Sequence, residues 1–184
     1  MESRSKPEDK AYVERQIRLS VILWICSAIS WYFLVPSHTL NLELPWKRMI
    51  YALRWQIFAL LPVLFVIRQI ANTRLNSKAI DPVNGGGEHL VDIYQRILVN
   101  TTEQFILHCI GVMVLSSYLT TETMKFIPFF VITFLIGRIL FYIGYTSSSP
   151  LNRAVGMAFN FVGNFVLIGS SIICFLLNGH LYQL

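Results

Sequence analysis

The segment RILVNTTEQFILH, residues 96–108, carries polar side chains at the start of a run that is otherwise apolar enough for a membrane. Arg96, Asn100 and Glu103 follow the spacing i, i+4, i+7, so an α-helix places them on one face over about 10 Å. Ionisable side chains inside a membrane rarely face lipid; they pair with each other or mark a functional site. This face is therefore the first candidate for chemistry.

A second polar stripe lies in FIPFFVITFLIGRILFYIGY, residues 126–145. Arg138, Phe141, Tyr142 and Tyr145 again share one helix face by their spacing. Glu103 is the obvious counter-charge for Arg138 or for the arginine of its own stripe. The simplest interpretation is a structural ion pair that fixes the packing of the helices without any chemistry.

The balance of charge favours a ligand instead. The groups expected at this end of the helices are the cations Arg96, Arg138, Arg153 and, from the preceding loop, Arg74, against the acids Asp92 and Glu103. Buried cations without partners are costly, and carboxylates of an anionic ligand would complete their pairing. Asn100 and the tyrosines would add neutral hydrogen bonds.

The rest of the chain provides the elements that hold these residues. Of its 184 residues, 54% are hydrophobic and 14% charged, which is typical of an integral membrane protein. Five runs near the roughly 20 residues needed to cross a bilayer are predicted as helices. They cover residues 17–35, 49–70, 90–119, 126–145 and 153–177. The sequence contains no nucleic-acid-reading motif and no metal-ligand spacing.

Basic residues are concentrated in the tail of residues 1–16 and in the loops after the second and fourth spans. The positive-inside bias therefore places the N-terminus in the cytosol and, after five crossings, the C-terminus in the lumen or outside. The membrane that we expect is the endoplasmic reticulum or another endomembrane. The loop NSKAIDPVNGGGEH matches no Gly-rich nucleotide fingerprint, and we interpret it as a flexible turn.

Together the motifs resemble the MAPEG superfamily, the membrane-associated proteins of eicosanoid and glutathione metabolism. The matching pieces are Asp92, Arg96, Asn100 and Glu103 in order, then GRILFYIGY at 137–145, then a short loop ending in Arg153. The resemblance covers residues 47–184 as a four-helix unit and leaves the helix at 17–36 as an addition. That extra helix and the loop IDPVNGGGEHL look most like the mattrin-type subgroup.

The resemblance implies a homotrimer in the lipid bilayer, with glutathione bound between neighbouring protomers. By position, the glutathione-binding residues would be Arg74, Arg96, Asn100, Glu103, Arg138, Tyr142 and Tyr145, and Arg153 would be the catalytic residue that activates the thiol. Departures from the family pattern are Val99, Gln104 and Phe141, which weaken any specific eicosanoid reaction. Two functions stay open: a glutathione transferase or peroxidase acting on lipophilic substrates, and a non-enzymatic membrane regulator that binds other membrane proteins.

Overall fold

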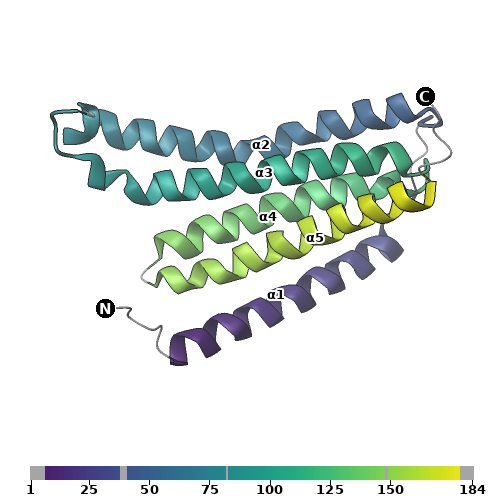
Figure 1. Cartoon of the computed structure of the whole chain (residues 1–184), viewed down its shortest axis with the longest axis horizontal. Helices are drawn as coiled ribbons and strands as arrows, with labels where there is room; N and C mark the ends of the chain where they lie inside the picture. Colours follow the sequence, from purple (N-terminus) through teal and green to yellow (C-terminus); the bar gives the residue numbers. More distant parts are fainter. Residues whose placement is uncertain (1–6, 38–40, 82, 148, 179–184) are drawn as a thin grey trace.

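The computed structural model describes residues 7–37, 41–81, 83–147 and 149–178, and in these segments the chain is built from helices alone (Figure 1). The long helices are α1 (Pro7–Leu34), α2 (Pro45–Leu75), α3 (Asp92–Tyr118), α4 (Phe126–Thr146) and α5 (Arg153–Asn178). Short 3₁₀ helices, η1 (Lys78–Ile80), η2 (Glu88–Leu90), η3 (Thr123–Lys125) and η4 (Pro150–Asn152), lie in the connections.

All five long helices have the length and hydropathy to cross a membrane, which confirms the predicted all-α, multi-pass class. The start of α5 agrees with the sequence prediction, and the bounds of α2, α3 and α4 agree to within a few residues. The first helix differs, because it begins at Pro7 and takes in residues 7–16 of the predicted tail; residues 1–6 lie outside the described part. Proline fits the first helical position, and Glu8 and Asp9 favour the positive end of the helix dipole.

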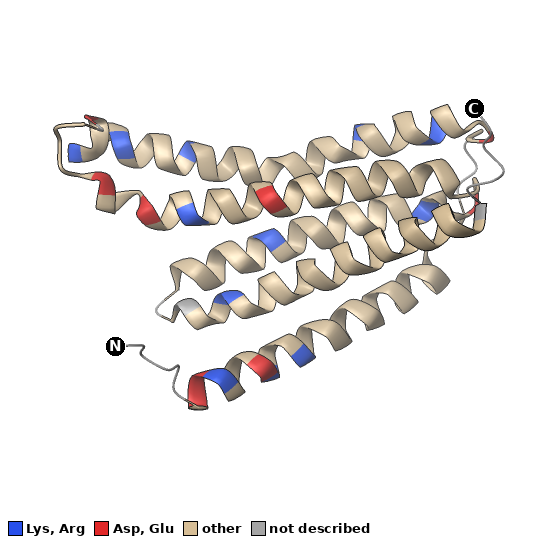
Figure 2. Ribbon diagram, viewed as in Figure 1, with Lys and Arg blue, Asp and Glu red and all other residues tan. Residues whose placement is uncertain are grey.

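The N-terminal end of α1 and the α2–α3 and α4–α5 connections lie at the same end of the bundle (Figure 1). Charged positions on α1, α3 and α5 gather in that half of the molecule (Figure 2). The arrangement agrees with the loops that the sequence assigns to one side of the membrane. Which side this end faces remains a prediction.

Helix α1 is fastened to the rest of the bundle through aromatic rings and one buried lysine. The ring of Trp24 packs edge-on against Phe129 at 5.4 Å, and Trp31 donates its Nε1 hydrogen to the Lys125 carbonyl oxygen at 2.9 Å. The Lys125 ammonium in turn donates to the carbonyl oxygens of Tyr32 and Val35, at 2.9 and 3.1 Å. These contacts tie the end of α1 and the residue after it to the start of α4, so the added helix is an integral part of the fold.

Helices α4 and α5 pack closely against each other at Gly156 of α5. A Cβ on Gly156 would overlap the backbone nitrogen of Phe141 and lie 2.5 Å from the carbonyl oxygen of Gly137. Such small residues allow close helix packing in lipid, where hydrophobic burial does not drive association.

Candidate functional site

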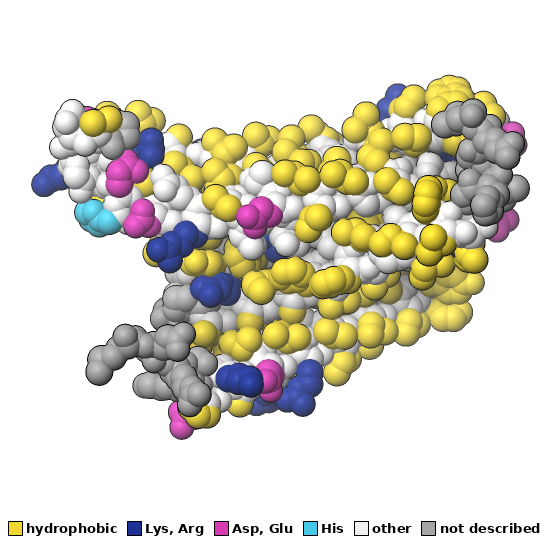
Figure 3. Space-filling view, in the orientation of Figure 1, with side chains coloured by type: hydrophobic (Ala, Val, Ile, Leu, Met, Phe, Trp, Pro, Cys, Tyr) yellow, Lys and Arg dark blue, Asp and Glu magenta, His cyan; other side chains and the backbone are white. Residues whose placement is uncertain are grey.

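One face of α3 forms a shallow groove of about 460 Å³ at the charged half of the bundle. The groove is lined by Asp92, Gln95, Arg96, Val99, Asn100 and Glu103. Arg96 and Glu103 are exposed and Asn100 is half-buried, so the predicted polar stripe faces outward in a single chain. In the space-filling view, basic side chains from the neighbouring ends of α3 and α5 come to this same face (Figure 3).

Arg138 of α4 contacts the stripe from behind, through Asn100; it lines the apolar groove between α2 and α4 and is not among the residues that line the α3 groove. Its Nη1 donates to Asn100 Oδ1 at 3.0 Å, and the residue is only 2% exposed. The guanidinium carbon lies 4.7 Å from the ring centroid of Phe141 and 5.8 Å from that of Phe134. The phenylalanine that departs from the family pattern is therefore one of the two rings against which this cation packs.

The predicted counter-charge is wrong. Among the described residues, Glu103 makes no ion pair with Arg138 or Arg96. Glu103 points outward, whereas Arg138 is held inside by an amide, and its Nε and Nη2 have no hydrogen-bond partner within the described chain. A buried guanidinium with two unused donor atoms and no carboxylate partner is costly.

Asn100 gains a defined orientation from this contact. Arginine can only donate hydrogen bonds, so the amide oxygen of Asn100 must face Arg138 and its NH₂ group is left as a donor. Along the groove, Arg96 supplies a cation, Asn100 a neutral donor and Glu103 an acceptor. The spacing of these groups suits an elongated ligand with charges of both signs.

Other predicted site residues lie elsewhere. Tyr142 packs edge-on against Phe65 of α2 at 5.1 Å, and together with Arg138 it lines a separate, apolar groove between α2 and α4. The Arg153 guanidinium lies 4.8 Å from the ring centroid of Tyr145, so these two predicted residues meet each other. Arg153 lines a groove between α1 and α5 and is not among the residues that line the α3 groove.

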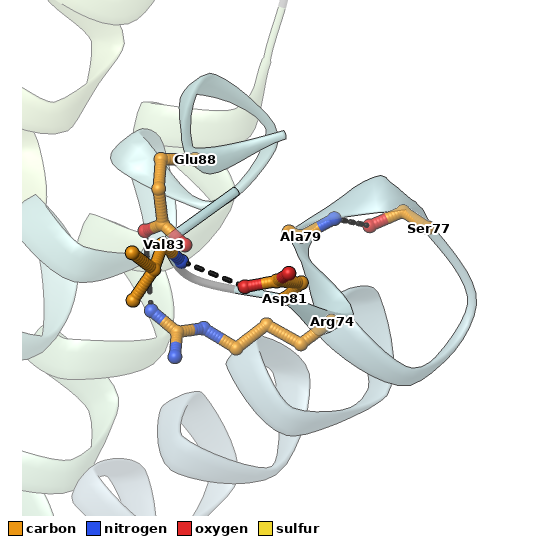
Figure 4. Close-up of polar contacts among 6 residues, drawn as sticks. All are labelled: Arg74, Ser77, Ala79, Asp81, Val83 and Glu88. Carbon is orange, nitrogen blue, oxygen red and sulfur yellow. Dashed lines mark hydrogen bonds and ion pairs between the residues drawn. The ribbon is translucent and has the colours of Figure 1, made fainter. Parts of the chain in front are cut away.

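Arg74 stands in the last turn of α2, and its Nη2 pairs with Glu88 Oε2 of η2, in the α2–α3 connection, at 3.2 Å (Figure 4). The same loop is held by Ser77, whose hydroxyl accepts from Ala79 N at 3.2 Å. The carboxylate of Asp81 accepts from the backbone N–H groups of Val83 and Asn84, each at 3.0 Å. The connection is thus a folded loop, more ordered than the flexible turn that its three glycines indicate.

The loop gives a pH prediction. The two backbone N–H groups hold the pKa of the Asp81 carboxyl below its ordinary value of 3.8, because they stabilise the charged form. A pKa that is lower in the folded state than in the unfolded state adds stability. This stability is fully present at pH values above the ordinary pKa, and it is lost as the pH falls through the folded-state pKa. We expect amide hydrogen exchange in residues 77–90 to stay protected at pH 5, relative to the intrinsic rate at that pH, and to lose this protection in strong acid. Asp81→Ala should lack the protection already at pH 5, whereas Asp81→Asn, which keeps an acceptor, should resemble the wild type.

Gln95 lines the groove although the sequence interpretation passed over it. Helical spacing is sufficient to predict this position, since Gln95 follows Asp92 by three residues and precedes Val99 by four, on the same helix face. Of the polar residues on α5, Asn164 bonds across to Gln104 Oε1 at 3.0 Å, while Asn160 donates within its own helix to Gly156 O at 3.2 Å. The first of these contacts ties α5 to α3 directly behind the groove.

Comparisons with known proteins point to one family. Two curated relatives, both called "Transmembrane protein 79", match 144 residues or 78% of this chain: the Bos taurus protein at 28% identity and the Mus musculus protein at 26%. The chain spans about a third (34%) of the length of these relatives. No solved structure matches it significantly. The family model described as "MAPEG family" matches residues 52–173, well over half of the chain and including all of α3 and α4. This chain belongs to the MAPEG family.

Proposed function

We propose that the α3 groove binds glutathione and that the protein works as a membrane-bound glutathione transferase or peroxidase. The observation that supports this most directly is Arg138, a buried cation with two unused donors and no acidic partner among the described residues. A tripeptide with two carboxylates and one ammonium group can pair with the cation, the neutral donors and the two carboxylates, Asp92 and Glu103, that line the groove.

The exposed position of the stripe supports a site between copies of the chain. Arg96 and Glu103 are exposed on a helix that crosses the membrane, where charged groups facing lipid are costly. A neighbouring protomer and its ligand would remove them from lipid. A homotrimer, as the family resemblance implies, is the assembly we propose.

Arg153 is the proposed catalytic residue. When bound, glutathione supplies a thiol whose thiolate is the nucleophile, and a free thiol with a pKa near 8.5 is only a few per cent ionised at pH 7. Lowering that pKa by about two units requires roughly 2.7 kcal/mol of differential stabilisation. One guanidinium close to the sulfur in a site shielded from water is sufficient for this. Arg96, Asn100, Glu103 and Arg138 would orient the tripeptide, and the second substrate would be a lipophilic electrophile or lipid hydroperoxide.

A second candidate function is a non-enzymatic membrane regulator that keeps the fold and binds other membrane proteins. One geometric observation favours it: Arg153 lines a different groove from the one lined by Arg96, Asn100 and Glu103. If glutathione binds without contact to Arg153, the site becomes a ligand sensor and has no thiolate to offer.

The test uses the purified full chain in detergent micelles. Isothermal titration with glutathione is followed by conjugation of a chlorodinitrobenzene, comparing wild type with Arg96→Ala and Arg153→Ala. We expect Arg96→Ala to weaken binding at least tenfold, and Arg153→Ala to keep binding but lose most of the turnover. Binding without turnover in the wild type supports the regulator, and no glutathione binding overturns the proposed function.

A further inference from the structure

The groove between α1 and α5 has a different character from the α3 groove. It measures about 400 Å³ and is lined by Val13 and Ile17 from α1 and by Leu151, Arg153, Ala154, Met157, Ala158, Phe161, Val162 and Phe165 from the α5 side. Every lining residue except Arg153 is apolar. Because α1 lies outside the residues 52–173 that match the family, this groove has one wall that the four-helix unit lacks.

We infer that this groove binds one acidic phospholipid of the surrounding leaflet, with its headgroup at Arg153 and one acyl chain along α5. The inference does not rest on the proposed glutathione chemistry, and it gives the Arg153 guanidinium a ligand other than the glutathione thiol. It rests on the length of the groove, on the charge at its end and on its walls.

The length fits a lipid chain. From Arg153 to Phe165 the groove covers twelve residues of α5, about 18 Å at 1.5 Å per residue. One leaflet contributes about 15 Å of the roughly 30 Å hydrocarbon core. A partner transmembrane helix would need an apolar face across both leaflets, so a groove that stops near the middle suits a lipid and not a helix.

The charge selects an acidic headgroup. Arg153 stands in the first turn of α5, at the end of the bundle, and makes no ion pair among the described residues. Its guanidinium packs on the ring of Tyr145, which leaves its hydrogen-bond donors free for phosphate or carboxylate oxygens. Basic pockets between transmembrane helices on the cytosolic side are typical sites for acidic headgroups.

The walls are fixed, so the groove is preformed. Tyr12 of α1 donates its hydroxyl to Asn152 Oδ1 at 2.7 Å, and Ser20 donates to the Val155 carbonyl oxygen at 3.1 Å. These two bonds bracket Val13 and Ile17 along α1. At the deep end, Phe161 and Phe165 stack with their centroids 6.0 Å apart, and Phe165 is 72% exposed. An acyl chain laid over these rings would cover the largest apolar side chains of the groove.

Native mass spectrometry of the full chain, with equal amounts of phosphatidylserine and phosphatidylcholine carrying the same acyl chains, tests the inference. Wild type is expected to retain phosphatidylserine at least fivefold over phosphatidylcholine. Arg153→Gln should remove this preference, and Arg153→Lys should keep it. Met157→Trp and Val13→Trp, which fill the groove from its two walls, should each lower bound phosphatidylserine at least fivefold.

Ile173→Trp is the matched control, since Ile173 is exposed on the same helix and lines none of the described grooves. It should bind both lipids as the wild type does. Equal retention of both lipids by the wild type, or lipid binding by Met157→Trp equal to that of Ile173→Trp, would overturn the inference. Glutathione titration of the same samples separates the two proposals, because Met157→Trp should leave glutathione affinity unchanged. Failure of the wild type to bind glutathione would leave the lipid result intact.

Discussion

Replacing Arg138 by methionine is expected to leave the protein at least as stable as the wild type in the absence of glutathione, and to lower its glutathione affinity at least tenfold. Methionine is shorter than arginine, but its flexible apolar side chain can pack between Phe134 and Phe141. The change removes a buried cation whose Nε and Nη2 have no partner in the described chain. Such replacements are often neutral or stabilising, because the cost of desolvating the charge disappears.

The loss of affinity follows from the same donors. A hydrogen bond to a charged group contributes about 1.5–3 kcal/mol, and 1.4 kcal/mol corresponds to a factor of ten. Asn100 also loses the partner that orients its amide. Opposite effects on stability and on binding would identify Arg138 as a residue kept for its ligand, at a cost to the free protein.

Lys125→Met is the control for this experiment. Lys125 is also a buried cation, but its ammonium donates to the carbonyl oxygens of Tyr32 and Val35. We expect this variant to lose about 1–3 kcal/mol of stability in detergent unfolding while its glutathione affinity stays unchanged. A destabilised Arg138→Met protein with normal glutathione binding would show that Arg138 serves the packing of the helices, as in the structural interpretation of the stripe.

Much of the fold follows from the sequence, because membrane spans obey simple constraints. Long apolar runs bounded by polar residues and proline are sufficient to place α2 to α5 near their observed bounds. The exception is α1, whose first ten residues are polar and were assigned to a tail. Helix signals are present there, including Pro7 and the pair Lys10–Glu14 at 3.9 Å, but a hydropathy pattern does not register a helix that continues beyond the membrane.

The site was only partly predictable for a different reason. Helical spacing correctly brought Arg96, Asn100 and Glu103 to one groove, since residues on one face follow from the 3.6-residue period. Partners across helices depend on rotation and depth, which the period does not fix. The sequence therefore assigned Glu103 to Arg138, whereas the structure gives that place to Asn100, one turn earlier on α3. In the same way, Tyr142 packs on α2, and Arg74 at the end of α2 pairs with Glu88 in the connection that follows.

Gly156→Ala is expected to destabilise the protein by about 3 kcal/mol, near the upper end for overpacking. The added Cβ meets backbone atoms of α4 on two residues, Phe141 and Gly137, and backbone cannot rotate away as a side chain can. The two helices must separate, and this loosens the α4–α5 contact along its length. Titration with a denaturing detergent measures the loss. Gly169→Ala on the same helix is the matched control, because a Cβ there would meet nothing within 4 Å.

Gly156→Ala should also disturb the α3 groove, because the ring of Phe141 links the α4–α5 contact to Arg138. Phe141 carries the backbone nitrogen that Gly156 leaves room for, and its side chain packs against the guanidinium of Arg138. Any shift of α4 away from α5 therefore moves the cation that orients Asn100. Gly156→Ala should lower glutathione affinity as well as stability, whereas Gly169→Ala should change neither. If Gly156→Ala kept wild-type stability, the two helices would have to pack further apart in the membrane than they do in this structure, and the placement of Arg138 behind the groove would fail with it.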